Sequence, residues 1–518
     1  MRNLVVLINP GHDDEVNPKV ARSFGARSRK IQREDPPISI INLGGFIRDH
    51  GFDVVVLDTH VEGDYREKLR QIIKAEPLII GFSVILGKFT KNAISLTKIV
   101  KALNKDIPIV WGGKIIHLAK NILLDSLDID FLVIGDGEIP FLNLLKCLRD
   151  GKDYRDIPGI GFKDNGKAVL NMNINPVGNL DDIYISEDFG WDLVKQHINQ
   201  RQVPYFINLY TSRGCKYNCS FCYLQDIKQY NAKKRFRRRS AENIIKEIDY
   251  LHKTFGINVV TFGDDDFFAN VKEVAAVIEY LKNKQIYIEH IWTNILNLKP
   301  DAIELISGIC QTVCYSIETV SSKLQKILRK PISVDKITEV NKKLRNVGIN
   351  TVHNILFGIP TETDEETKAN IDLLKKLKQI NPHMRANTYI LSPIPGTPIF
   401  EFGQKLAGKE IKWNLTDLAN FHFRYMDQAA LKFRPYLKPE DNTFFENVSE
   451  LANELFKELN GELSPEQRTI IESDKRLRYI FGDFDNINRP NDKKRKYILD
   501  EVLEAIDTNQ QLPQISVF

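Results

Sequence analysis

The chain has 518 residues, more than one ordinary hydrophobic core accommodates, so two or three domains are expected. Its 72 basic and 68 acidic residues nearly balance, which gives no reason to expect nucleic acid or an anionic membrane as an obligatory partner. No segment approaches the roughly 20 apolar residues that span a bilayer, and Pro10 and Gly11 interrupt the first apolar run, so we expect a cytoplasmic protein without a membrane span.

Residues 1–155 alternate short apolar runs with amphipathic segments. The runs, such as LVVLINP, FDVVVLDT and PLIIGFSV, are rich in Val and Ile and continuous rather than alternating, as strands covered on both faces are. One intervening segment, SIINLGGFIRDHG, stops at a glycine as helices often do. Five such units predict an α/β, doubly wound, Rossmann-like domain.

Residues 156–200 are predicted to form a hairpin, with Asn-Gly at its turn, and a polar connector. A second βα series over 201–400 predicts a partial (β/α)6 barrel of the TIM type, whose site would lie at the carboxyl ends of its strands. Residues 401–518 are mostly helical in pattern. The strands expected in the barrel are 205–211, 257–263, 286–295, 311–319, 350–359 and 384–392.

Three of the six cysteines, Cys215, Cys219 and Cys222, fall on one loop after the first strand of the second series. Three thiolates on one loop can hold three irons of a [4Fe–4S] cubane and leave the fourth iron open to a chelating small molecule. A structural zinc site would need a fourth protein ligand nearby, but the next candidates are His252 and Cys310. The pattern therefore favours an iron–sulfur cluster.

With Phe221 in the aromatic position, this Cys-x3-Cys-x-aromatic-Cys loop resembles the signature of the radical S-adenosylmethionine superfamily. The resemblance extends over 205–400. It implies that the open iron binds S-adenosylmethionine and that electron transfer cleaves it to a 5′-deoxyadenosyl radical. It also implies an oxygen-sensitive enzyme with an external electron donor of the flavodoxin or ferredoxin type.

Other segments resemble the superfamily at strand ends. GDDDF occupies the usual place of a segment that contacts the methionine amine, and its carboxylates suit an ammonium group, although they could instead cap the next helix. SIET matches a position near the ribose or methionine, GIPTET a turn near adenine, and PIPGTP a segment that closes the barrel. The implied S-adenosylmethionine-binding residues are Phe221, Gly263, Asp264, Asp265, Glu318, Gly358 and Pro360.

A doubly wound domain ahead of such a barrel resembles the cobalamin-binding radical enzymes. Small residues at strand ends let a large ligand lie against backbone at the carboxyl edge of the sheet. The positions that the resemblance assigns to the cobalamin nucleotide tail are Ser83, Gly112, Gly113, Gly135, Asp136, Gly137 and Glu138.

The string DTHVEG, residues 58–63, spells the Asp-x-His-x-x-Gly motif with which many cobalamin proteins ligate cobalt. In those proteins the motif follows the first strand, whereas here it follows the second. We therefore favour a surface loop over cobalt ligation by His60, and likewise for His12. The lower axial ligand of cobalt stays unassigned, as the radical branch commonly lacks a histidine there.

Three further features have a structural and a functional interpretation. The basic run KKRFRRR, 233–239, could contact phosphate or nucleic acid, but a solvated loop is the commoner role. Cys310 and Cys314 are expected to be buried small residues rather than a second cluster or a methyl carrier. The aromatic stretch FHFRYMDQAALKFRPYL could cover the barrel mouth or form an ordinary packed helix.

The resemblance implies a two-cofactor reaction in which cobalamin supplies a methyl group to an unactivated carbon that the radical has activated. A non-methylating cyclase of the anaerobic magnesium-protoporphyrin type is the first alternative. A radical enzyme whose first domain has lost cobalamin is the second, and a non-catalytic iron–sulfur or nucleic-acid-binding module is the third. No catalytic acid or base is nominated, and the substrate, whether a small molecule, lipid or peptide, is not indicated.

Overall fold

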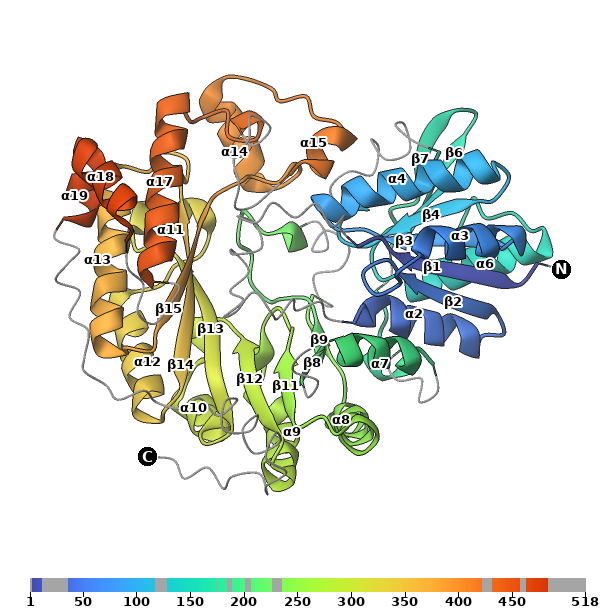
Figure 1. Cartoon of the computed structure of the whole chain (residues 1–518), viewed down its shortest axis with the longest axis horizontal. Helices are drawn as coiled ribbons and strands as arrows, with labels where there is room; N and C mark the ends of the chain where they lie inside the picture. The colour runs from blue at the N-terminus through green and yellow to red at the C-terminus, as the bar shows by residue number, and fades with distance from the viewer. Residues whose placement is uncertain are drawn as a thin grey trace.

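A computed structural model describes residues 2–11, 36–116, 128–174, 176–183, 189–200, 206–225, 235–421, 431–456 and 463–482. Two large sheets organise these residues, one before residue 171 and one after residue 205. Figure 1 shows them on opposite sides of the molecule, each with its own helices. None of the helices described is both long and apolar enough to cross a membrane.

Seven strands form the N-terminal sheet: β1 (Leu4–Asn9), β2 (Asp53–Asp58), β3 (Ile79–Ser83), β4 (Ile109–Gly112), β5 (Phe131–Val133), β6 (Ile160–Asp164) and β7 (Lys167–Leu170). Their spatial order is β2-β1-β3-β4-β5-β6-β7, and the first five are mutually parallel. The strand order reverses beside β1, as in doubly wound sheets, so the predicted Rossmann-like fold is confirmed.

The helices of this half are α2 (Ile38–Asp49), α3 (Tyr65–Lys74), α4 (Lys88–Leu103) and α6 (Glu138–Asp150). They cover both faces of the sheet. Val6 and Ile8 of β1 pack in the core that contains α3 and α4, whereas Val5 and Leu7 pack in the core that contains α2 and α6. Burial on both faces explains why the strand sequences are apolar without alternation.

The predicted hairpin is β6–β7, and it extends the N-terminal sheet rather than standing apart in the connector. Asn165 and Gly166 form its turn with φ angles of +48° and +76°, as a type I′ turn requires. β6 then pairs antiparallel with β5. The connector continues through a short 3₁₀ helix, η1 (Leu180–Ile183), and α7 (Trp191–Gln200).

Six parallel strands form the second sheet: β8 (Phe206–Leu209), β11 (Val259–Phe262), β12 (Tyr287–Trp292), β13 (Cys310–Glu318), β14 (Asn350–Phe357) and β15 (Arg385–Ile390). They lie in sequence order, with β8 and β15 at the two edges, so the sheet is an open partial barrel of the predicted kind. Its helices are α8 (Ala241–Phe255), α9 (Val271–Lys284), α10 (Pro300–Ile306), α11 (Ser322–Leu328), α12 (Val334–Asn346) and α13 (Asp364–Ile380).

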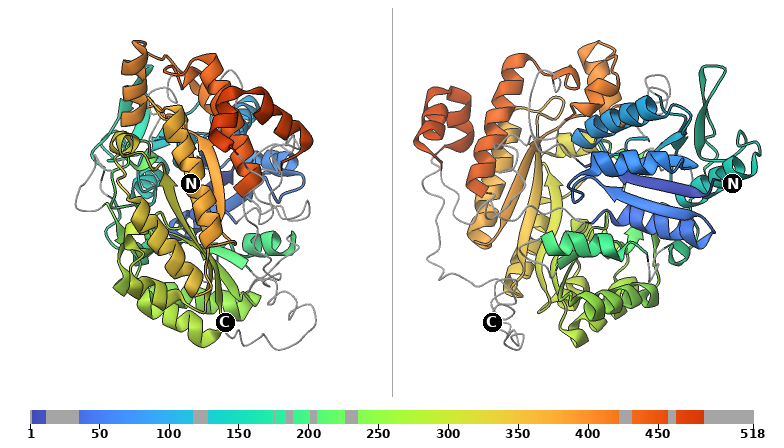
Figure 2. Two further views of the ribbon diagram at one scale, coloured as in Figure 1. Left: turned by 90° about the vertical axis from the view of Figure 1, so that its left-hand side faces the viewer. Right: turned by 45° about the vertical axis from the view of Figure 1, so that its right-hand side comes forward.

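The C-terminal region contains α14 (Pro398–Ala407), α15 (Leu415–Ala419), α17 (Pro439–Phe456), α18 (Pro465–Ser473) and α19 (Lys475–Phe481). The last three lie against the β15 side of the barrel (Figures 1 and 2). Thr388 of β15 donates its hydroxyl hydrogen to the Ser449 carbonyl of α17 at 2.7 Å. In the opposite direction, Leu415 and Leu418 of α15 are buried in the N-terminal core. The C-terminal region therefore joins both halves.

Candidate active site

A two-stranded ribbon forms the stem of the cysteine loop. β9 (Ser212–Arg213) pairs antiparallel with β10 (Arg237–Arg238) just beyond the carboxyl end of β8. Gly214 follows β9 with a φ of +88°, and a Cβ at this position would overlap the backbone oxygen of Arg235 across the ribbon. The stem therefore accepts only glycine immediately before the first cysteine.

None of the three cysteines on this loop forms a disulfide, and all three are partly buried. Burial, together with the nearby charges of Asp266, Asp265 and Cys222, raises the pKa of the Cys215 thiol to about 12. Such a thiol is protonated at neutral pH unless a metal displaces the proton. No three His, Cys, Asp or Glu side chains converge on a single ion in the described ranges. Cubane ligation instead places each cysteine sulfur on a different iron, which suits three thiols spread along a loop.

The residues between the cysteines anchor the loop to the barrel. Ser220 donates its backbone hydrogen to the Leu328 carbonyl at 2.9 Å and its hydroxyl hydrogen to the Ile327 carbonyl at 2.7 Å, both at the end of α11. Its own carbonyl accepts the backbone hydrogen of Ile399 at 3.2 Å. Phe221 packs against a small buried apolar cluster formed by α11, α14 and the strand ends. These contacts place the predicted aromatic position beside the barrel mouth.

The three adjacent carboxylates after β11 point to different places. Buried Asp264 accepts hydrogen bonds from the Thr211 backbone at 3.1 Å and hydroxyl at 2.8 Å. Asp266 is also buried and braces the loop after β12. Asp265 alone of the three is exposed, and the Tyr223 hydroxyl donates to it at 3.4 Å. Contact of Asp264 or Asp265 with an ammonium group stays a prediction, and the geometry favours Asp265.

Gly263, at the start of the same segment, is held by its neighbours. A Cβ there would lie 2.7 Å from the Tyr210 ring and 2.8 Å from Asn208 Oδ1. The predicted S-adenosylmethionine contact at this glycine therefore coincides with a tight packing position on the inner face of the barrel.

Two more residues predicted to bind S-adenosylmethionine lie at the ends of neighbouring strands. Glu318 ends β13 with a φ of +66°, and its buried carboxylate pairs with Lys330 at 2.9 Å. Holding a non-glycine residue in this left-handed backbone conformation costs about 1–3 kcal/mol, and such strain is typical of functional sites. Gly358, directly after β14, accepts a hydrogen bond through its carbonyl from the Tyr436 hydroxyl at 3.1 Å, and Pro360 is buried beside it.

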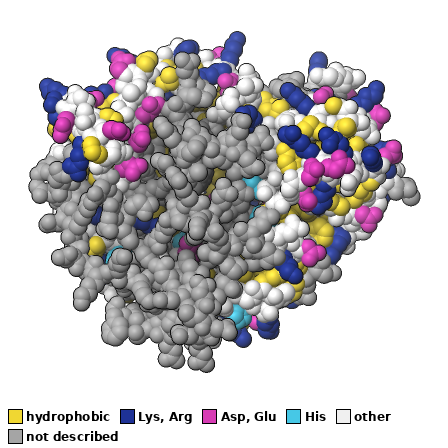
Figure 3. Space-filling model, viewed as in Figure 1, with side chains coloured by type: hydrophobic (Ala, Val, Ile, Leu, Met, Phe, Trp, Pro, Cys, Tyr) yellow, Lys and Arg dark blue, Asp and Glu magenta, His cyan; other side chains and the backbone are white. Residues whose placement is uncertain are grey.

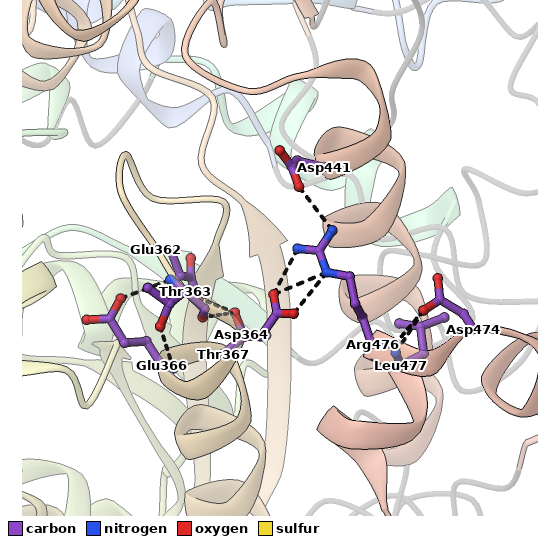
Figure 4. Close-up of polar contacts among 9 residues, drawn as sticks. All are labelled: Glu362, Thr363, Asp364, Glu366, Thr367, Asp441, Asp474, Arg476 and Leu477. Carbon is purple, nitrogen blue, oxygen red and sulfur yellow. Dashed lines mark hydrogen bonds and ion pairs between the residues drawn. The ribbon is translucent and has the colours of Figure 1, made fainter.

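The GIPTET turn is braced from within and from the C-terminal region (Figure 4). Thr363 and Glu366 form a capping box at the start of α13. Burial raises the pKa of Glu362 to about 8. Asp364 receives a two-pronged ion pair from Arg476 of α19, with a shortest contact of 2.8 Å. The turn is therefore a rigid element of backbone beside the cluster loop.

The carboxyl edge of the N-terminal sheet presents small residues where cobalamin is expected. Ser83 and Gly112 are register partners at the ends of β3 and β4. A Cβ on Gly112 would have no neighbour closer than 3.9 Å, so the backbone there is open to a ligand. At Gly113 a Cβ would lie 2.6 Å from the Val84 carbonyl oxygen, because the two loops touch. This edge fits a large ligand lying against backbone, and the individual contacts stay predictions.

The two predicted carboxylates of the GDGE segment face the barrel. Arg213 contacts Glu138 at 2.7 Å and Asp136 at 3.2 Å, and Arg237 also pairs with Asp136. Burial acts to raise the pKa of Asp136, but the two arginines outweigh it and hold the pKa below its ordinary value. Both side chains are thus engaged by arginines of the ribbon. A Cβ on Gly135 would lie 2.8 Å from the Ile174 side chain, and nucleotide contact at the two glycines of the segment stays a prediction.

The basic run is largely internal rather than a solvated loop. Arg237 pairs with Asp136, Arg238 contacts Glu273 at 3.3 Å, and Arg239 contacts Glu247 at 2.5 Å. Residues 233–234 lie outside the described residues. On the face shown in Figure 3, basic and acidic side chains are interspersed over the described surface. Three of the seven residues of the run therefore form ion pairs, one with the N-terminal domain and two within the barrel.

The Asp-x-His-x-x-Gly string begins in a buried polar cluster at the end of β2, the edge strand farthest from the β4–β5 loops. Asp58 accepts hydrogen bonds from His60 at 3.1 Å and from His197 of α7 at 2.9 Å. Asn9, at the end of β1, also contacts the His60 ring at 3.4 Å. The second candidate, His12, lies outside the described residues. Through Asp58 the cluster joins His197 of the connector to the N-terminal domain, and His60 is part of that cluster.

Replacing Asp58 by asparagine is expected to destabilise this junction by roughly 3 kcal/mol at neutral pH, because it removes the charge shared by two buried imidazoles. Burial acts to raise the pKa of Asp58, but hydrogen bonds from His197 and His60 hold it well below its ordinary value. That stability is present above the ordinary carboxyl pKa and is lost as the pH falls below it. Thermal midpoints should therefore differ at pH 7 and at pH 4, and converge only as the pH falls well below 4 toward the lowered pKa of Asp58. Asp53→Asn, an exposed change on the same strand, should be nearly neutral at both.

Cys310 and Cys314 lie within β13 and are both buried, as expected for small core residues. Burial raises the pKa of the Cys310 thiol to about 12, and that of Cys314 is also raised by burial. Neutral thiols of this kind are poor nucleophiles and metal ligands. Their expected role as packing residues fits this environment.

Two residues that flank the cysteine loop were not singled out from the sequence. Arg213 and Tyr223 stand on either side of the three cysteines, and both contact the N-terminal domain: Arg213 reaches Glu138, and the ring of Tyr223 lies 4.7 Å from Lys114 Nζ. Adjacency to the cysteine motif was the available signal. Their partners, more than 70 residues away in the chain, leave no trace in local pattern.

Comparison with known proteins decides the family. The Radical SAM superfamily matches residues 209–374, and the B12 binding domain matches residues 28–145. The uncharacterized methyltransferase PH0819 of Pyrococcus horikoshii is 30% identical over 385 residues, which cover 73% of this chain and 80% of that protein. This chain belongs to the cobalamin-binding radical S-adenosylmethionine enzymes. The family and both domain types expected from the sequence are confirmed.

Two further similar proteins share less sequence identity with this radical enzyme. The anaerobic magnesium-protoporphyrin IX monomethyl ester cyclase of Rubrivivax gelatinosus is 25% identical over 393 residues, covering 72% of this chain and 67% of the cyclase. The methyltransferase TsrM from Kitasatospora setae, solved with cobalamin and a [4Fe–4S] cluster, aligns with a TM-score of 0.64 and 19% identity. That alignment covers 85% of this chain and 86% of TsrM, so the two share a fold.

A cobalamin-binding radical enzyme has three cofactors: a [4Fe–4S] cluster, S-adenosylmethionine and cobalamin. The described residues fit each of them. Three thiols lie on one braced loop, strained or tightly packed residues line the barrel mouth, and open backbone lies at the β3–β4 edge. The residues expected to hold the three cofactors therefore lie near the junction of the two sheets.

Proposed function

We propose that this enzyme methylates an unactivated carbon of its substrate by radical chemistry. One observation carries the proposal: the loop of Cys215, Cys219 and Cys222 touches the same N-terminal loops that are expected to hold cobalamin. Arg213 makes that contact before the first cysteine and Tyr223 makes it after the last. A radical source and a methyl carrier would then face one substrate. The names of PH0819 and TsrM, both methyltransferases, support the same reaction.

When bound, the cluster supplies the electron that cleaves S-adenosylmethionine, and cobalamin supplies the methyl group. The chain's own residues hold and orient the reactants. On the inner face of the barrel, Asn354 donates to the Ser316 hydroxyl oxygen at 3.1 Å, and Asn387 donates to the Asn354 side-chain oxygen at 3.4 Å. This row of amides offers polar contacts that orient a substrate below the cluster loop. Orientation of this kind is the main contribution a protein makes to cofactor chemistry.

The proposal is tested by anaerobic reconstitution of the whole chain with iron, sulfide and cobalamin. Reductant, methyl-labelled S-adenosylmethionine and a metabolite extract are then added. We expect a brown protein that also shows the cobalamin absorption bands. It should form 5′-deoxyadenosine and S-adenosylhomocysteine together, and the label should appear in a product heavier than its precursor by one CH₂ unit.

Other outcomes would contradict specific parts of the proposal. 5′-Deoxyadenosine without S-adenosylhomocysteine, and a product without label, would favour cyclase or oxidoreductase chemistry, the activity named for the Rubrivivax relative. Absence of cobalamin bands from the loaded protein would favour a first domain that only binds substrate. Absence of 5′-deoxyadenosine would favour a non-catalytic iron–sulfur module.

A further inference from the structure

The N-terminal domain contacts the cysteine loop just before its first cysteine, Cys215. Arg213, two residues before Cys215, contacts both carboxylate oxygens of Glu138, at 3.2 and 2.7 Å, and one of Asp136 at 3.2 Å. The Glu138 side chain is only 4% exposed and that of Arg213 23%, so water screens this pair weakly. A fork-to-fork arginine–carboxylate pair fixes orientation as well as distance. Glu138 opens α6, immediately after the β5 loop.

A different part of the N-terminal domain contacts the same loop just after its last cysteine, Cys222. Tyr223 directly follows Cys222, and Lys114 Nζ lies 4.7 Å from the centre of its ring. Lys114 follows the two glycines at the end of β4. Tyr223 also packs, together with Leu86 of the β3 loop, against the buried apolar cluster of residues 394–433. A cation held over a ring and shared apolar packing both constrain where the loop can lie.

We propose that Arg213 and Tyr223 are positioning residues that fix the cluster loop relative to the cobalamin-binding loops. The inference rests on the proposed function, because it takes cobalamin to lie at the β3–β5 edge. Ordinary domain packing would require no contact at either end of the ligand loop. Here both ends are held, and each is held by a loop of that edge.

This arrangement has a thermodynamic consequence. When cobalamin orders the β3–β5 loops, it also orders their contacts with Arg213 and Tyr223, and so stabilises the cluster loop. By linkage, loading the cluster must stabilise cobalamin binding by the same factor. Loss of either contact should reduce this coupling without removing either ligand-binding site.

The test compares hydroxocobalamin affinity before and after reconstitution of the whole chain with iron and sulfide, by spectrophotometric titration under anaerobic conditions. For the wild type we expect cluster loading to tighten cobalamin binding at least about fivefold, the lower end of typical couplings. Arg213→Gln and Tyr223→Leu should each bring that factor toward one. Arg213→Lys should retain part of it, because the charge remains. Arg48→Gln, which removes a two-pronged contact with Asp49 on α2, away from the cysteine loop, should leave the factor unchanged.

A second measurement reports geometry directly: the distance distribution between cob(II)alamin and the reduced cluster, from pulsed EPR. It should be narrow in the wild type and in Arg48→Gln, and broad in Arg213→Gln and Tyr223→Leu. A wild-type coupling factor of one, or variants that keep the wild-type factor and distance distribution, would overturn the inference. A wild type that binds no cobalamin or no cluster would instead overturn the proposed function.

Discussion

Alanine at Cys215, Cys219 or Cys222 is expected to reduce S-adenosylmethionine cleavage by at least about a thousandfold, equivalent to ~4 kcal/mol of activation free energy. Each thiolate is expected to hold one iron, and no other His, Cys, Asp or Glu side chain of the described ranges converges with the loop around an ion. The measurement is 5′-deoxyadenosine formed per chain with excess reductant, alongside iron content and the EPR spectrum of the reduced cluster.

Cys147→Ala is the matched control. Its thiol is half-buried on α6 and donates to the Asp153 carbonyl at 3.3 Å, away from the cysteine loop. We expect it to keep wild-type iron content and cleavage. Cleavage that persisted in any of the three loop variants would contradict the assignment of the cluster ligands, and with it the radical chemistry.

Gly214→Ala is expected to have the second largest effect, a loss of roughly 3 kcal/mol or more in stability together with most of the bound iron. The added Cβ would overlap the Arg235 backbone oxygen, and that oxygen cannot move aside without separating β9 from β10. The ribbon carries the first cysteine, so its displacement would also disturb cluster assembly. Thermal midpoint and iron per chain after reconstitution measure the two effects.

Gly256→Ala is the control that distinguishes the cost of a left-handed backbone conformation from the cost of steric overlap by the added Cβ. Gly256 ends α8 with a φ of +65°, and a Cβ there would meet nothing within 4 Å. We expect this variant to lose only about 1–2 kcal/mol, the cost of a left-handed alanine, and to retain its iron. If Gly214→Ala matched Gly256→Ala in both measurements, the stem would not have the steric role assigned to it.

The architecture of both sheets could be predicted because each strand is a local pattern. Continuous Val- and Ile-rich runs identified β1 to β5, and capped helical segments separated the six barrel strands. The Asn165–Gly166 turn identified the hairpin, because those two residues accept positive φ. Pairing of the hairpin with β5 was not predicted, since strand-to-strand contact across a helix leaves no mark in local sequence.

The cysteine loop could likewise be predicted, since the spacing of three thiols carries chemical information by itself. The surrounding side chains could not. Asp264 and Asp265 are neighbours of identical chemistry, yet one is buried against Thr211 and the other exposed beside Tyr223. Asp136, which the resemblance assigns to a nucleotide contact, pairs with Arg213, and the nucleotide contact stays a prediction. The burial and the partner of each carboxylate depend on which distant segment of the chain packs beside it in the fold.

The placement of α15 bears on how this protein is synthesised. Leu415 and Leu418 fill a face of the N-terminal domain, beside α4. A ribosome must therefore synthesise all six barrel strands before the first domain can complete its core. Until α15 is synthesised, an apolar surface on α4 stays exposed. During that time the nascent chain can bind chaperones or aggregate through this surface. Expression of the first domain alone would make that exposure permanent.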